Sequence, residues 1–234
     1  MARYQQQQLV SEIGEDGQRK IKAAKVLIIG AGGLGTPVAT YLASAGVGCI
    51  GIVDGDVISL SNLHRQFLYT DAEVGLLKSY TLAEKLRLMN QEIAVNSYPF
   101  YLDAQNGPEI LKEYDVICDC TDDVETRILI DEMCHNYHKP LIYAAILEWE
   151  GYLTVLNHNK KIRLGNIFSE LSLREHAANS CSVSGIVNTT CGIVGSMQAA
   201  EVLKIILGIN SNVDGSILCI NTILNSYRLF KIKN

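Results

Sequence analysis

Residues 30–35 read GAGGLG, a glycine-rich turn between an apolar run and an amphipathic segment. In a G-x-G-x-x-G pattern, Gly30 permits a tight turn, Gly32 lets the backbone approach a phosphate, and Gly35 allows a helix to pack closely. A helix that starts at this turn directs its positive end at the anion. Asp54 ends the next apolar run, about twenty residues on, where a carboxylate can accept hydrogen bonds from a ribose. The segment therefore predicts a nucleotide site.

Cationic residues further along bear on which nucleotide is bound. A dinucleotide pyrophosphate carries two charges and can be held largely by backbone amides, whereas a triphosphate carries about twice that charge and usually needs cationic side chains or a metal ion. A polar turn supplies Asn62, Arg65 and Gln66, and Lys78 precedes a helical pattern. These residues suit a triphosphate, although Arg65 and Lys78 also fit two ordinary surface cations.

An acidic stretch, DCTDD at residues 119–123, follows another buried apolar run. Open α/β sheets bind ligands at the carboxyl ends of their strands, where these carboxylates are expected. Asp122 fits two roles. It could cap the following helix in a D-x-x-E pattern with Glu125, or it could bind Mg²⁺ together with phosphates. The strand pattern alone leaves both roles open.

The elements that must position these residues follow from hydrophobic patterning. Short, nearly continuous apolar runs alternate with helical patterns up to Ala145, which predicts a mostly parallel sheet with helices on both faces. Alternating residues then recur in 148–157, 216–221 and 226–234, which indicates an antiparallel C-terminal extension. We expect a Rossmann-like α/β fold that forms a single domain over residues 1–234.

Two further segments connect the halves of this sheet. Residues 158–185 are polar and weakly periodic, and we interpret them as a mobile crossover loop. Residues 194–208 form a strong amphipathic pattern, so we expect a helix that ends at Gly208.

Composition excludes several classes of function. The chain has 234 residues, of which 48% are hydrophobic and 19% charged, as expected for one globular domain. A net charge of -5 gives no general basic field for nucleic acid. We find neither an apolar leader nor the roughly 18 uninterrupted apolar residues of a membrane span. Seven scattered cysteines indicate reduced thiols. We expect a cytoplasmic protein that binds neither nucleic acid nor membrane.

Several segments, taken in order, resemble the ThiF/MoeB/HesA family of E1-like adenylating enzymes. They are RY, DGQRKI, VLIIGAGGLGTPVATYLASAGVG, DGDVISLSNLHRQFLY, VGLLKSYTLAEKLRLMN, DVICDCTDDVETR, EGYLTV and GIVGSMQAAEVLKIILG. The S-N-L-x-R-Q and D-C-T-D blocks are specific. The resemblance implies an enzyme that uses ATP to activate the C-terminal Gly-Gly carboxylate of a ubiquitin-like sulfur carrier protein, either ThiS for thiamine or MoaD for molybdopterin.

The resemblance also implies roles for matching positions. Asp54 would hold the ribose, cationic side chains and Asn62 would contact the phosphates, and Asp122 would hold Mg²⁺. The expected nucleotide-binding residues are Gly30, Gly32, Gly33, Gly35, Asp54, Asp56, Asn62, Arg65, Gln66, Lys78 and Asp122. Arg65, Lys78 and Asp122 are also assigned to catalysis, because a carboxylate that attacks the α-phosphorus brings two anions together and expels pyrophosphate.

The chain departs from the family pattern at two places. Zinc-binding members carry two C-x-x-C pairs, which are missing here, so we expect no structural zinc. The family usually begins R-Y-x-R-Q, and its second arginine reaches the ATP of a dimer partner. Gln6 stands at that place. The consequence is a slower enzyme, compensation by a cation such as Arg3, or a protein without turnover.

Two cysteines lie near the last predicted helix. Cys181 matches the cysteine that ThiF-type enzymes use covalently with the carrier, so we assign it to catalysis, with a passive thiol as the alternative. This match is the main reason to favour ThiS over MoaD. Cys191 lies nearer the helix, and we interpret it as a packing residue.

We therefore expect an ATP-dependent adenylyltransferase that acts on a ubiquitin-like sulfur carrier, forms a homodimer and works with a possible sulfur donor protein. Three alternatives stand beside this prediction. They are a MoeB-like adenylyltransferase of molybdopterin synthase, a non-catalytic E1-like binding partner, and an NAD-dependent oxidoreductase. The last would leave Arg65, Lys78 and Asp122 without a purpose.

Overall fold

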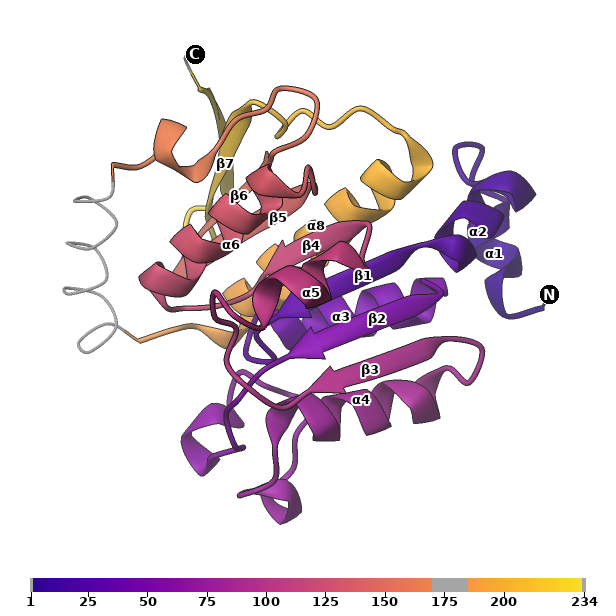
Figure 1. The fold of residues 1–234 in the computed structure, drawn as a ribbon, viewed down its shortest axis with the longest axis vertical. Helices are drawn as coiled ribbons and strands as arrows, with labels where there is room; N and C mark the ends of the chain where they lie inside the picture. The colour runs from indigo at the N-terminus through magenta and orange to yellow at the C-terminus, as the bar shows by residue number, and fades with distance from the viewer. Residues whose placement is uncertain (1, 170–184, 233–234) are drawn as a thin grey trace.

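The computed structural model describes residues 2–169 and 185–232, which build one mixed sheet (Figure 1). Its strands are β1 (Lys25–Ile29), β2 (Cys49–Val53), β3 (Ala94–Tyr98), β4 (Val116–Asp119), β5 (Leu141–Leu147), β6 (Glu150–Leu156), β7 (Ser216–Asn221) and β8 (Ser226–Lys231). They lie in the order β3-β2-β1-β4-β5-β6-β7-β8. Strands β1 to β5 are parallel, and β6, β7 and β8 join by antiparallel pairing. The predicted Rossmann-like sheet with an antiparallel extension is confirmed.

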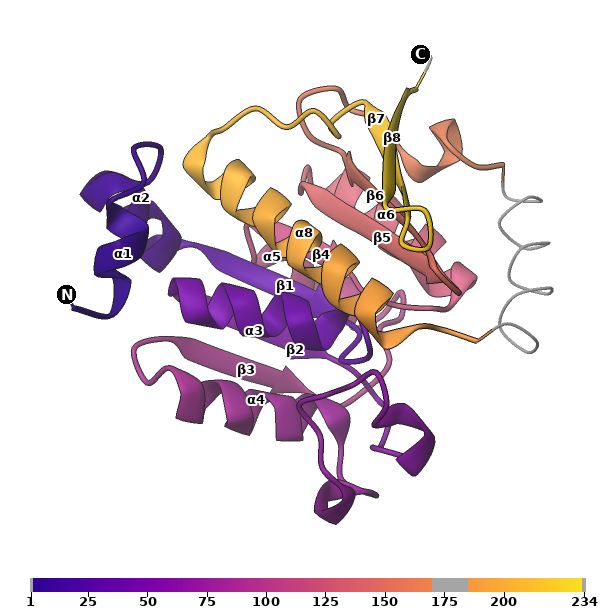
Figure 2. The same ribbon diagram turned by 180° about the vertical axis from the view of Figure 1, so that it is seen from behind.

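Helices cover both faces of this sheet. They are α1 (Gln5–Gln8), α2 (Gly14–Ala23), α3 (Gly35–Ala45), α4 (Lys78–Met89), α5 (Gly107–Lys112), α6 (Val124–Asn136) and α8 (Asn188–Leu207). Figure 2 shows α3, α4 and α8 on one face, and Figure 1 shows α5 and α6 on the other. Each face carries its own hydrophobic core. In β1, Val26 and Ile28 pack into the core under α3, α4 and α8, while Leu27 and Ile29 pack into the core under α5 and α6. This explains why the strand is continuously apolar.

Helix α8 is the longest helix among the described residues. It begins at Asn188 instead of 194, and it ends at Leu207, where Gly208 takes a left-handed conformation with φ 75°. By length and composition α8 could cross a membrane. It packs instead against α3, β5 and β6, so it is placed as a core helix of the domain.

The start of the predicted crossover loop is anchored to the domain. The Asp214 carboxylate accepts hydrogen bonds from the backbone N–H groups of Asn159 (3.1 Å) and Lys160 (3.2 Å). The Arg163 guanidinium pairs with Asp131 of α6 at 2.9 Å. These contacts therefore do not support the predicted mobility for residues 158–169. Residues 170–184 of the predicted loop, including Cys181, lie outside the described residues.

One buried amide ties α8 to the two strands beneath it. The Gln198 side chain has no exposed surface, and its Nε2 donates to the carbonyls of Asp119 (2.9 Å) and Ile142 (3.0 Å). These carbonyls belong to β4 and β5. The amide therefore fixes the helix over the carboxyl end of β4 and the start of β5.

Replacing Gln198 with leucine should lower the free energy of unfolding by about 2–4 kcal/mol, because two buried carbonyl oxygens lose a donor. Urea unfolding monitored by circular dichroism measures this change. The matched control is Gln91→Leu, at an exposed position, which should change stability by less than about 0.5 kcal/mol. Equal effects of the two substitutions would contradict this role of Gln198.

Candidate active site

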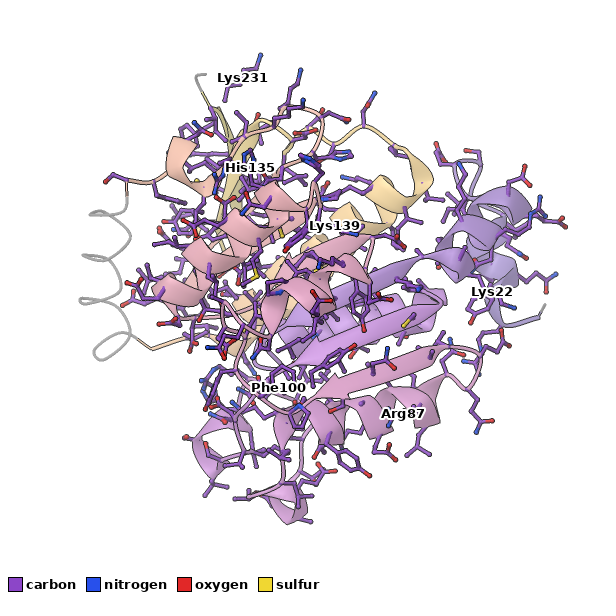
Figure 3. The ribbon with its side chains drawn as sticks, in the orientation of Figure 1. Lys22, Arg87, Phe100, His135, Lys139 and Lys231 are labelled. Carbon is purple, nitrogen blue, oxygen red and sulfur yellow. The ribbon has the colours of Figure 1, made fainter. Side chains whose placement is uncertain are left out.

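A cavity of about 340 Å³ opens at the carboxyl ends of the parallel strands. Every expected nucleotide-binding residue except Gly35 lines it, namely Gly30, Gly32, Gly33, Asp54, Asp56, Asn62, Arg65, Gln66, Lys78 and Asp122. Phe100, which is labelled in Figure 3, lies on its wall near the ends of β2 and β3. The fold thus brings together residues that lie far apart in the sequence.

The glycine turn fits its predicted conformation. Gly30 has φ 98°, and a Cβ atom built there would lie 2.6 Å from the carbonyl oxygen of Cys120. A Cβ atom at Gly35 would collide with the Gly30 carbonyl. Gly35 therefore allows α3 to pack against the turn and does not face the cavity, which agrees with its predicted packing role but not with direct nucleotide contact.

Asp54 holds the glycine turn against the end of β2. Its Oδ2 accepts a hydrogen bond from the Ala31 N–H at 2.7 Å, and its Oδ1 accepts one from the Asp56 N–H at 2.8 Å. Burial raises the pKa of Asp54, and these two hydrogen bonds oppose that rise. The carboxylate lines the cavity. Its contact with a ribose remains a prediction.

Lys78 is held at the cavity wall by an ion pair. Its Nζ lies 2.7 Å from Oδ2 of Asp56, and the lysine is only 6% exposed. The Tyr101 hydroxyl donates to the other oxygen of Asp56 at 2.5 Å. Burial acts to raise the pKa of Asp56, but the hydrogen bonds from Lys78 and Tyr101 outweigh it, so the pKa is lowered. Tyr101 carried no signal in the sequence.

Arg65 and Gln66 lie beside the glycine turn. The Arg65 guanidinium contacts the Ser61 carbonyl oxygen at 3.2 Å and His64 Nε2 at 2.9 Å. Gln66 is 2% exposed, and its Oε1 has no hydrogen-bond partner within the part of the chain that the structure describes. A buried amide at a cavity wall with an unmet hydrogen bond is suited to contact a polar ligand.

The structure corrects the capping alternative for Asp122. The N-cap of α6 is Asp123, whose Oδ2 accepts hydrogen bonds from the N–H (2.8 Å) and the hydroxyl (2.7 Å) of Thr126. The helix begins one residue later than the D-x-x-E pattern with Glu125 requires. Asp122 is therefore not the cap, and it lines the cavity.

A magnesium ion fits this arrangement only if phosphates complete its coordination. Within residues 2–169 and 185–232, no group of three or more histidine, cysteine or acidic side chains could hold a metal ion by itself. Magnesium sites commonly use one or two carboxylates together with substrate phosphates. Asp122 is the residue that could supply such a carboxylate beside the glycine turn.

Cys191 is buried, as its packing interpretation requires, but it also lines the cavity. It lies in the first turn of α8, and a Cβ atom at Gly33 would lie 3.0 Å from its Sγ. Burial raises the pKa of its thiol to about 11, although the positive charge of Arg65 acts in the opposite direction. The predicted helix start at 194 excluded Cys191 from the helix, which hid this position.

Gln6 and Arg3 lie far from the cavity of their own chain. Helices α1 and α2 lie beyond the amino ends of β1 and β2, opposite the arrowheads (Figure 1), and Figure 3 shows Lys22 of α2 at the other end of the molecule from Phe100. The Arg3 guanidinium donates to the Met89 carbonyl at 3.2 Å. Neither residue therefore lines the cavity of its own chain.

The comparison with known families agrees with this geometry. The model of the ThiF family matches residues 4–234. The chain belongs to the ThiF family. Among similar proteins, adenylyltransferase and sulfurtransferase MOCS3 of Xenopus laevis is 39% identical over 231 residues, covering 99% of this chain and 51% of that protein. A probable molybdopterin-synthase adenylyltransferase of Gracilaria tenuistipitata var. liui is 38% identical over 232 residues, covering 98% and 64%.

This ThiF-family chain thus spans about half to two thirds of the length of these relatives. Among solved structures, E. coli MccB bound to MccA-N7isoASN has a TM-score of 0.86 at 21% identity, covering 99% of this chain and 72% of that one. E. coli MccB with ATP has a TM-score of 0.78 at 23% identity, covering 93% and 66%. At these identities the likeness establishes the fold.

Asp56→Asn should lower the free energy of unfolding at pH 7 by about 1–2 kcal/mol, because a buried ammonium loses its charged partner. The pKa of Asp56 is lower in the folded protein than the ordinary value, so its contribution is fully present above that value and is lost as the pH falls through the folded pKa. Urea unfolding from pH 7 to 3 should therefore show the two proteins converging in acid. A difference that stays constant over this range would contradict the ion pair.

Proposed function

We propose that this chain is an ATP-dependent adenylyltransferase that converts the C-terminal carboxylate of a ubiquitin-like sulfur carrier of the MoaD type into an acyl adenylate. The observation that carries the proposal is one cavity lined by the glycine turn, Arg65, Lys78 and Asp122. Two cations beside a carboxylate that could share Mg²⁺ with phosphates suit a triphosphate better than the two charges of a dinucleotide. E. coli MccB, which shares the fold, has been solved with ATP.

The names of the relatives favour a MoaD-type carrier over the ThiS-type carrier that Cys181 suggested. Those relatives are molybdopterin-synthase adenylyltransferases or combine adenylyltransferase and sulfurtransferase in their names. None of these names refers to thiamine. The MoeB-like alternative therefore becomes our proposal in place of the thiamine pathway.

The proposed chemistry is a displacement at phosphorus. One oxygen of the carrier carboxylate bonds to the α-phosphorus while the bond from that phosphorus to the bridging oxygen breaks, and pyrophosphate leaves with the electron pair. Arg65 and Lys78 neutralise the phosphates, and the backbone amides of the glycine turn support them. When bound at Asp122, Mg²⁺ would add further charge neutralisation. Positioning and charge account for the catalysis, so no covalent nucleophile is required for adenylation.

We also propose that the enzyme is a homodimer. The segment that carries Asn62, Arg65 and Gln66 exposes large apolar side chains, which include Val57, Leu60, Phe67, Leu76 and Tyr80. This surface borders the cavity that Gln6 cannot reach within its own chain. A second copy covering it would bury the apolar side chains and could bring its own N-terminal segment towards the nucleotide.

Asp122→Ala should abolish carrier-dependent exchange of labelled pyrophosphate into ATP, because the charge at the acidic turn is lost. The adjacent Asp123→Ala is the matched control. It should lower the free energy of unfolding by about 1 kcal/mol through the lost cap, yet keep most of the exchange activity. The same assay and a urea titration measure both effects. Exchange close to the wild-type rate in Asp122→Ala would refute the role of this carboxylate.

Cys181→Ser should leave pyrophosphate exchange nearly unchanged, because adenylation places its charge on Arg65, Lys78 and Asp122. If the thiol passes the activated carboxylate to a sulfur donor, the variant should lose any reducible covalent adduct with the carrier and form thiocarboxylate more slowly. Mass spectrometry of the carrier detects both products. An equal fall in exchange and thiocarboxylate formation would show that Cys181 supports the first step instead.

A further inference from the structure

Arg127 is a buried cation on the wall of the cavity, and none of the roles above uses it. Its side chain is 7% exposed and lines the cavity from α6. One guanidinium nitrogen donates to the carbonyl oxygen of Thr121, and the guanidinium carbon lies 4.9 Å from the centre of the Tyr143 ring. These contacts fix the orientation of the guanidinium but supply no negative charge.

The charge of Arg127 has no carboxylate in direct contact among the described residues. No carboxylate oxygen there lies within 4.0 Å of its nitrogens. Asp119 is nearby, but its Oδ1 accepts from the N–H (2.9 Å) and hydroxyl (2.7 Å) of Thr121. Burial raises the pKa of Asp119, and the positive charge of Arg127 partly opposes that rise. Burial acts to lower the pKa of Arg127, but Tyr143, Asp119 and Asp122 raise it, the two carboxyl groups without direct contact. An anionic ligand in the cavity would therefore find an oriented guanidinium that a protein carboxylate does not already occupy.

The strand order shows which part of the cavity Arg127 serves. Along the edge β3-β2-β1-β4-β5, Tyr101 follows β3, Asp54 follows β2 and Gly30 follows β1. The expected ribose ligand and phosphate turn thus lie over β2 and β1. Arg127 lies beyond them, on the β4–β5 side.

Apolar side chains share the lining of the cavity with Arg127. Ile146 near the end of β5 and Ile186 before α8 both belong to its wall. Tyr143, which lies against the guanidinium, is the β5 partner of Asp119 in the sheet register. An extended peptide tail with small or no side chains suits such a wall, and its terminal carboxylate would meet the guanidinium.

We infer that Arg127 binds the C-terminal carboxylate of the carrier tail, with Tyr143 and the Thr121 carbonyl orienting it, and so delivers the nucleophile to the α-phosphorus from the β4–β5 side. This inference rests on the proposed function. One carboxylate oxygen stays on the guanidinium while the other bonds to phosphorus, and the bridging oxygen leaves with pyrophosphate towards Arg65 and Lys78. Arg127 stays protonated throughout, so the step needs no other reactant.

The test compares two forms of one probe, a MoaD-type carrier that ends in Gly-Gly as the free acid or as the C-terminal carboxamide. Fluorescence anisotropy without nucleotide gives the affinity of each form. Wild type should bind the acid about 10- to 100-fold more tightly than the amide, as expected for a hydrogen-bonded charge pair. Arg127→Gln should bring this ratio close to one and leave ATP affinity within about twofold.

Two further variants separate charge from structure. Arg127→Lys keeps the charge but not the two-pronged geometry, so it should retain part of the preference for the acid, and it remains informative if Arg127→Gln fails to fold. Arg19→Gln is the matched control, because Arg19 lies on the surface of α2 with 69% of its side chain exposed. It should keep the wild-type ratio.

An unchanged acid-to-amide ratio in both Arg127 variants would overturn the inference. A parallel loss of ATP affinity would also overturn it, because Arg127 would then act by supporting the turn that carries Asp122. If wild type binds both carrier forms equally but still exchanges pyrophosphate with the acid form, the inference fails while the proposed function stands. If wild type neither binds nor reacts with either form, both fail.

Discussion

The close approach of two backbone turns is the constraint on which the site depends. The turn after β1 and the turn after β4 lie so near each other that any side chain at Gly30 would press on the Cys120 carbonyl. This contact sets the glycine turn beside the acidic residues that follow Asp119. The buried amide of Gln198 holds the same strand end from the side of α8. The sheet order, helix α8 and the glycine pattern together hold the turn after β1 against the turn after β4.

Charge is distributed around these turns in a way that the composition of the whole chain conceals. The protein carries a net charge of -5, yet Arg65, Lys78 and Arg127 line one cavity. Each is held by a different contact, namely a backbone carbonyl with a histidine, a carboxylate, and a carbonyl with an aromatic ring. In the proposed reaction two anions must meet in this cavity, and cations that are fixed in advance reduce the reorganisation that such a reaction requires.

Much of this arrangement could be predicted from sequence, because local patterns encode it. The apolar run, glycine turn and terminal aspartate form one continuous unit, and the switch to alternating residues after Ala145 marks the antiparallel strands. Other features depend on contacts between distant segments. Tyr101 reaches Asp56 only through the pairing of β3 with β2, and Cys191 reaches Gly33 only because α8 starts early. The capping alternative for Asp122 was wrong because the cap of α6 is the adjacent Asp123, and either aspartate fits a helix start in the sequence. Arg127 lies four residues after Asp123, so both face the same side of α6 near its start. This spacing could have drawn attention to Arg127.

The central claim is that this cavity joins ATP to a protein carboxylate. Isotope exchange between labelled pyrophosphate and ATP tests it most directly, measured on the wild-type protein with and without a MoaD-type carrier that ends in Gly-Gly. We predict that label enters ATP only when the carrier is present, because the carboxylate must attack before pyrophosphate can leave and return. Exchange that proceeds equally well without a carrier, or no exchange in either mixture, would contradict the account.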